Sequence, residues 1–82
     1  MITHISIGNE KLECVMSDII VADGIQLKAE VAINDDDEIL IDDCKCTVHI
    51  AIAGNMCEIE GMCRPHLDYG GLSIATIECN EK

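Results

Sequence analysis

Residues 44–66 contain four cysteines and two histidines, the side chains that bind soft metal ions or act as nucleophiles. The segments 46–49 and 63–66 both have the form Cys-x-x-His, and 13 residues separate them. This spacing is close to that of a ribbon-type zinc site, in which two short turns supply two ligands each. If zinc is present, we expect its ligands to be Cys46, His49, Cys63 and His66.

The residues around these ligands favour a different interpretation. The stretch that follows Cys46 is rich in β-branched residues and contains neither Gly nor Pro, so it favours a strand over a turn. On a strand, Cys46 and His49 point to opposite faces, which places His49 on the outer surface. All six cysteines fall on the apolar faces of their strands, and free Cys is commonly buried. We therefore expect core thiols and no bound metal or other cofactor.

Disulfides are a less favoured alternative for this even number of cysteines. No export signal is recognisable, and a reducing compartment keeps thiols free. A nucleophilic centre is a further alternative, because a thiol, a guanidinium, an imidazole and a carboxylate lie within residues 63–68. Catalytic groups usually come from separate elements, however, and the phosphate-binding glycine motifs are absent. We expect no catalytic residues and no enzymatic activity.

The composition indicates one small sheet domain. The chain of 82 residues is 49% apolar but contains no Phe, no Trp and one Tyr. A chain of this length forms a single domain, here residues 1–82. Its interior must be built from Ile, Val, Leu, Ala, Met and Cys, of which Ile and Val favour sheets. Small core side chains bury little area per residue, so self-association is another way to gain stability.

A two-residue alternation of apolar and polar side chains runs through most of the chain. It is cleanest in residues 25–33, where every odd-numbered residue is apolar. Asp23-Gly24, just before this segment, is a hairpin signal. Further strands are expected at 3–7, 11–22 (bent or bulged near Asp18), 38–42, 44–53, 56–63 and 72–79, with a turn at 54–55 and a long loop at 64–71. This pattern predicts an all-β domain, a small antiparallel meander of about six or seven strands that forms a barrel or a sandwich.

The charge restricts the classes of partner. Sixteen acidic and five basic residues give a net charge of −11. Such a field opposes direct binding to nucleic acid or to an anionic membrane, and it favours a basic protein surface. The longest uninterrupted apolar runs are about four residues, far short of a membrane span. A soluble, cytoplasmic protein is expected.

Two segments stand out as candidate binding sites. Residues 34–43 hold six carboxylates whose spacing does not fit an EF-hand calcium loop, and they form either a solvated turn that protects a sheet edge or an acidic face for a basic partner. Residues 64–71 supply the only Arg and the only Tyr, which are types enriched at interface hot spots, although Tyr69 could instead cap the core. The predicted partner-binding residues are Asp35, Asp36, Asp37, Glu38, Asp42, Asp43, Glu58, Glu60, Arg64 and Tyr69.

Three functions are consistent with these features. The preferred one is a non-enzymatic acidic binding protein that occupies a basic, nucleic-acid-binding surface of another protein. Its carboxylates would imitate the phosphates of the nucleic acid. Small, acidic, catalytically empty proteins are typical of the inhibitors that phages and mobile elements direct against host defence, such as anti-CRISPR proteins. The alternative is a structural homo-oligomer that assembles through strand edges or sheet faces. The second alternative is a small zinc-binding module.

Overall fold

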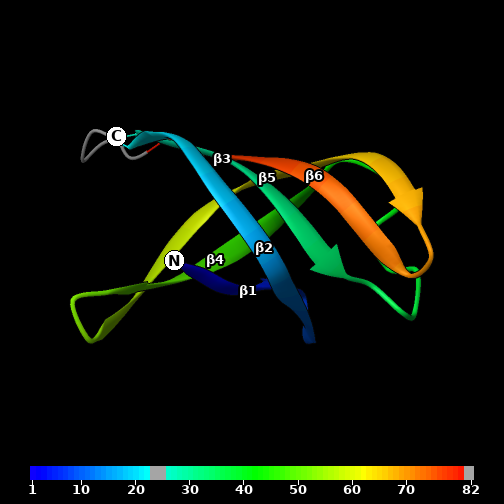
Figure 1. Cartoon of the computed structure of the whole chain (residues 1–82), viewed down its shortest axis with the longest axis horizontal. Coiled ribbons are helices and arrows are strands. Elements are labelled where there is room, and N and C mark those ends of the chain that lie inside the picture. The colour runs from blue at the N-terminus through cyan, green and yellow to red at the C-terminus, as the bar shows by residue number, and fades with distance from the viewer. Residues whose placement is uncertain (23–25, 81–82) are drawn as a thin grey trace.

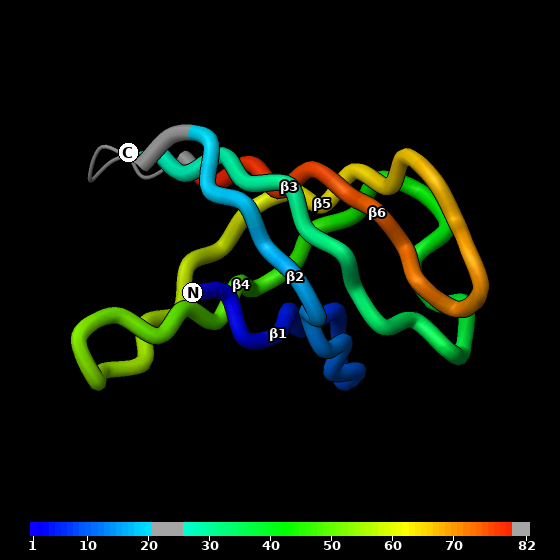
Figure 2. The backbone as a smooth tube through the Cα atoms, viewed as in Figure 1, coloured from blue at the N-terminus to red at the C-terminus, as the bar shows by residue number. Residues whose placement is uncertain are grey.

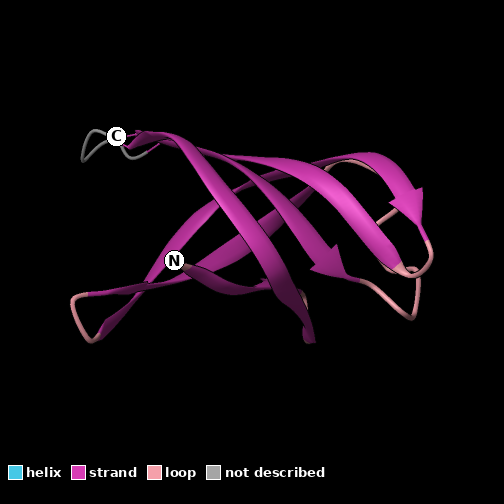
Figure 3. Cartoon of the chain, viewed as in Figure 1, coloured by secondary structure: helices cyan, strands magenta, loops and turns pink. Residues whose placement is uncertain are grey.

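The computed structural model describes residues 1–22 and 26–80, in which six antiparallel strands close into a small barrel (Figure 1). The strands are β1 (Ile2–Ile7), β2 (Glu10–Ala22), β3 (Gln26–Asn34), β4 (Cys44–Ile52), β5 (Asn55–Tyr69) and β6 (Leu72–Asn80). No helix occurs in these described ranges (Figure 3). The expected all-β class is confirmed, and of the two expected architectures the barrel is the one that forms.

The strand order around the barrel is β1-β2-β3-β6-β5-β4. Each half of the chain is a three-stranded meander, and the barrel closes because β3 pairs with β6 and β1 pairs with β4. A single connection, residues 35–43, joins the two halves at one end of the barrel (Figure 2). The same end carries the turn between β5 and β6, and the hairpin between β4 and β5 extends from the opposite end (Figure 1).

The narrow interior explains why the chain can fold without Phe or Trp. Alternate residues of each strand point inward, and the interior of a barrel narrows as the number of strands falls. Six strands leave room for aliphatic and sulfur side chains, and the small side chains of Ala29 and Ala75 are fully buried among them. The buried core consists of Ile2, Ile5, Leu12, Leu27, Ala29, Val31, Ile33, Leu40, Cys46, Val48, Ile50, Cys63, Ala75, Ile77 and Cys79.

The strand expected at residues 38–42 does not form. This segment belongs to the β3–β4 connection, in which Leu40 is buried while Ile41 is 70% exposed. The barrel is closed, so β3 and β4 each already have two neighbouring strands and offer no edge to a further one. The apolar residues of this segment instead close the barrel end, where Leu40 is buried and Ile39 packs against the core.

The loop expected at residues 64–71 is also wrong, because β5 continues through Tyr69. Pro65 is accommodated by a register shift between Pro65 and Leu67, a bulge that leaves His66 unpaired in the ladder. The connection shrinks to Gly70-Gly71, whose φ angles of 58° and 83° fit a type I′ turn.

The bulges of β2 and the turn after β4 lie close to the positions predicted from the sequence. β2 is bulged as predicted, but at two places that flank Asp18, between Cys14 and Met16 and between Ile19 and Val21. The turn after β4 lies at residues 53–54, one residue earlier than expected. The Asp23-Gly24 hairpin turn falls outside the described residues, although β2 and β3 pair antiparallel on either side of it.

Candidate functional site

A buried carboxylate holds the β3–β4 connection in place. Asp35 is 3% exposed, and its two carboxylate oxygens accept the backbone N–H groups of Ile39 and Leu40, each at 2.8 Å. Its carbonyl accepts the N–H of Glu38 at 3.1 Å, and Glu38 has a φ of 53° in the left-handed region. That conformation is unfavourable for a residue with a Cβ, so these bonds fix a turn that the segment would not hold by itself.

The burial of Asp35 removes it from the predicted binding residues, because its carboxylate is fully engaged inside the molecule. The other five carboxylates of the connection are exposed. We call them the acidic loop: Asp36, Asp37, Glu38, Asp42 and Asp43. Sequence alone gave Asp35 the same role as its neighbours, and only the barrel end against which it packs separates them.

The β5–β6 turn lies against the acidic loop. The N–H of Asp35 donates to the carbonyl of Gly71 at 2.7 Å. The Ser73 hydroxyl lies 3.3 Å from a carboxylate oxygen of Asp35 and donates to Asp68 at 2.8 Å. Tyr69, which precedes the turn, is 78% exposed, so the interpretation that it caps the core is wrong. The structure thus brings Tyr69 and the acidic loop to the same end of the barrel.

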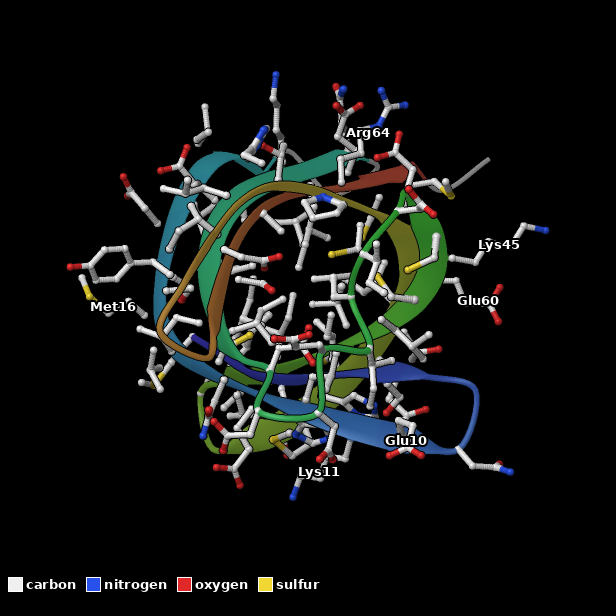
Figure 4. All side chains as sticks on the ribbon, turned by 90° about the vertical axis from the view of Figure 1, so that its right-hand side faces the viewer. Glu10, Lys11, Met16, Lys45, Glu60 and Arg64 are labelled. Carbon is white, nitrogen blue, oxygen red and sulfur yellow. The ribbon has the colours of Figure 1, made fainter. Side chains whose placement is uncertain are left out.

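The remaining predicted residues lie elsewhere. Glu58 and Glu60 are exposed on the outer face of β5, towards the β4–β5 hairpin. Looking along the barrel, Glu60 lies beside Lys45, while Arg64 projects from a different side (Figure 4). The ten predicted binding residues therefore do not form one continuous surface.

The four residues of the alternative zinc site are also kept apart. Cys46 and Cys63 point into the barrel, as the strand parity predicted, whereas His49 and His66 lie on its outside. The His66 imidazole is hydrogen bonded to the hydroxyl of Thr76. Within residues 1–22 and 26–80, no three His, Cys, Asp or Glu side chains are grouped so that they could hold a metal ion. The same separation leaves Cys63 without the neighbouring imidazole that a nucleophilic centre would require.

Five of the six cysteines face the interior, and one does not. Cys46, Cys63 and Cys79 are buried, and Cys14 and Cys44 are half-buried against the core. Burial raises the pKa of Cys14 and of Cys79 to about 11, which leaves both as neutral thiols. Cys57 is exposed, contrary to expectation, because the described pairing of β5 with β6 begins only at Met62 and leaves β4 as the neighbour of β5 at this position.

A stacked histidine pair lies on the outer faces of β1 and β4. The rings of His4 and His49 have centroids 3.9 Å apart and an interplanar angle of 17°. The Ser6 hydroxyl lies 2.9 Å from Nε2 of His49, and Glu58 lies 3.5 Å from its Nδ1. His49 is on the outer face as predicted, but these neighbours cover most of it. The sequence analysis missed this pair, since only the β1–β4 register places the two rings together.

Acidification is expected to destabilise the protein through His4. Burial lowers the pKa of His4 below its usual 6.5; the neighbouring His49 and Lys11 lower it further, while Glu13 and Glu58 oppose the shift. Because the unfolded chain then binds the proton more readily, stability that is complete above about pH 6.5 is lost as the pH falls towards the folded-state pKa. Urea midpoints should therefore fall between about pH 7 and about pH 5.

The substitution His4→Gln should flatten this pH dependence, and His66→Gln, which changes an exposed imidazole, is the matched control. An unchanged slope in His4→Gln would show that other groups cause the acid sensitivity.

Comparisons with known protein families, curated proteins and solved structures found no match for this chain. In the part of the chain that the structure describes, no helix is long and apolar enough to cross a membrane.

Proposed function

We propose that this protein is a non-enzymatic acidic binding protein that occupies a basic, nucleic-acid-binding surface of another protein. The observation that carries the proposal is the acidic loop, five exposed carboxylates on a connection that Asp35 fastens to the barrel end. The exposed ring of Tyr69 at the same end supplies an apolar anchor of the kind that dominates interface energies.

The fixed conformation of the acidic loop favours binding. Carboxylates on a rigid scaffold lose little conformational entropy when a partner binds, whereas the same charges on a flexible tail would have to be ordered. The net charge of −11 adds long-range attraction towards a basic surface, which speeds association and makes it sensitive to salt. The combination resembles a short array of phosphates in charge.

The proposal includes a cytoplasmic location and no cofactor. A protein of this type inhibits its partner by exclusion, since nucleic acid and the acidic loop compete for one site. Inhibitors that phages and mobile elements direct against host defence are the class of protein that this mode of action fits.

The proposal is tested by neutralising the acidic loop without changing its shape. The variant Asp36→Asn, Asp37→Asn, Glu38→Gln, Asp42→Asn, Asp43→Asn removes five negative charges from one end of the barrel. Its matched control removes five from the strands, as Glu10→Gln, Glu13→Gln, Asp18→Asn, Glu30→Gln, Glu78→Gln. Each tagged protein is incubated with a lysate of the cells that carry the gene, and the bound proteins are quantified at low and high salt.

At low salt, we expect the acidic-loop variant to retain at least about tenfold less of the basic protein than the wild type does. The control should retain most of it. Equal retention by both variants would mean that the acidic loop only solvates the barrel end. Equal loss by both would mean that net charge, and no particular surface, attracts the partner.

A homo-oligomer remains the second candidate because of one observation on β2. The described pairing gives β2 a partner on both sides only at Glu10–Glu13, and from Met16 onward β3 is its single neighbour. Val15, Met16, Ile19 and Ile20 along this stretch are exposed, Met16 at 73%. Such an edge invites pairing with another strand, although its two bulges oppose it. Light scattering on the pure wild-type protein distinguishes the candidates, since only assembly predicts a mass that rises with concentration.

A further inference from the structure

The barrel interior contains a cluster of thiols that the proposed function does not use. Five cysteines from four strands face inward: Cys14 of β2, Cys44 and Cys46 of β4, Cys63 of β5 and Cys79 of β6. Packing alone would be served equally well by Ala or Val at these positions. Their closeness gives them a chemistry that aliphatic residues lack.

Within this cluster, the Cys46 and Cys63 thiols contact each other across the β4–β5 ladder. Cys46 is opposite Gly61 and Cys44 is opposite Cys63, so Cys46 and Cys63 are diagonal neighbours on the inner face. Gly61 has no side chain to separate them. The side-chain interaction between the two thiols lowers the pKa of Cys46 against the effect of its burial, while the same interaction and burial raise the pKa of Cys63.

The two thiols differ in their access to solvent. Cys63 is fully buried, whereas Cys46 is 5% exposed and lines a surface depression of about 690 Å³ together with Lys45, Glu60 and Gly61. A small neutral oxidant can therefore approach Cys46 through this depression more easily than it can reach Cys63. The arrangement pairs the more acidic thiol, on a residue that borders the depression, with a fully buried thiol that can react with it in a second step.

We propose that Cys46 and Cys63 form a peroxide-sensitive dithiol that closes to an intramolecular disulfide between β4 and β5. In the first step the Cys46 thiolate attacks hydrogen peroxide, the O–O bond breaks, and Cys46 sulfenic acid and water form after one proton is taken up. In the second step the Cys63 sulfur attacks the sulfenic sulfur, the S–O bond breaks, and the hydroxyl leaves as water with the Cys63 proton. Two thiols are oxidised and one peroxide is reduced to two waters. The inference is independent of the proposed function.

The test uses the full-length, fully reduced protein. The folded chain is exposed to a small molar excess of hydrogen peroxide, the remaining thiols are alkylated, and the intact mass is measured. Proteolysis after glutamate and lysine cuts at Lys45, Glu58 and Glu60, so that Cys44, Cys46 and Cys63 fall on separate peptides. Fragmentation of the cross-linked peptide in the mass spectrometer then distinguishes Cys46 from Cys57 in the wild type.

We expect the monomer to lose two hydrogen atoms and to yield a Cys46–Cys63 peptide. Cys46→Ser and Cys63→Ser should abolish this product, while Cys44→Ser and Cys57→Ser should leave it unchanged. Six alkylated thiols after treatment, a Cys44–Cys63 peptide, or a dimer linked only through the exposed Cys57 would each overturn the assignment. The wild-type peptide map decides the matter even if a serine variant fails to fold.

Discussion

Replacing Gly61 with alanine is expected to prevent stable folding or to cost about 3 kcal/mol of unfolding free energy. A Cβ at this position would lie 2.6 Å from the Glu78 carbonyl oxygen and 3.2 Å from the Cys79 Cα, and it would overlap the Cys79 sulfur. The oxygen and the Cα belong to the backbone of β6, so the clash cannot be relieved by a rotamer change. Where a Cβ can be accommodated, Gly→Ala normally stabilises a protein by restricting the unfolded chain. A decrease in the unfolding free energy of Gly61→Ala would therefore indicate the clash.

Urea unfolding followed by far-ultraviolet circular dichroism measures this effect. The double variant Gly61→Ala, Cys79→Ala is the control, because it removes the overlap with sulfur and leaves the overlap with the backbone. It should recover only part of the lost stability. A Gly61→Ala protein with the wild-type midpoint would contradict the close approach of β5 and β6.

Replacing Asp35 with alanine is the second change with a large expected effect, again about 3 kcal/mol. The substitution leaves the N–H groups of Ile39 and Leu40 without their acceptors, at a barrel end where Leu40 is buried. Unfolding free energy should fall by this amount in Asp35→Ala and by less in Asp35→Asn, which keeps one oxygen acceptor.

Asp37→Ala is the matched control, since it removes an exposed carboxylate from the same connection. It should change stability by less than about 0.5 kcal/mol. If Asp35→Ala and Asp37→Ala were equally stable, the connection would owe nothing to the buried carboxylate, and the ordered acidic loop on which the proposed function depends would lose its support.

The strands could be predicted from the sequence because one face of each had to be buried. Alternation in residues 25–33 identified β3, and the same parity put Cys46 inside and His49 outside. Alternation is a local signal, however, and it carries no information about the order in which strands pair. The pairing of β3 with β6 and of β1 with β4 could therefore not be predicted from the sequence, and neither could the absence of a strand at 38–42.

Most residues of the candidate site could be predicted from the sequence, but their positions relative to one another could be predicted only in part. The clustering of carboxylates in residues 35–43 identified the acidic loop, because these charges are neighbours in the chain. The role of Asp35 depends on Ser73 and Gly71, which approach it only in the folded barrel. Cys57 was misplaced because parity gives the direction of a side chain but not how far the core extends along a strand.

Binding to a basic partner can be observed directly by native mass spectrometry of the tagged protein, recovered gently from a lysate of the cells that carry the gene. One spectrum reports the oligomeric state, any bound metal and any partner. If the acidic loop binds a basic surface, the spectrum will show a metal-free chain in complex with a basic, nucleic-acid-binding protein, and the complex will dissociate as the salt concentration rises. A bare homo-oligomer, or a chain that carries a stoichiometric zinc ion, would contradict the proposed function.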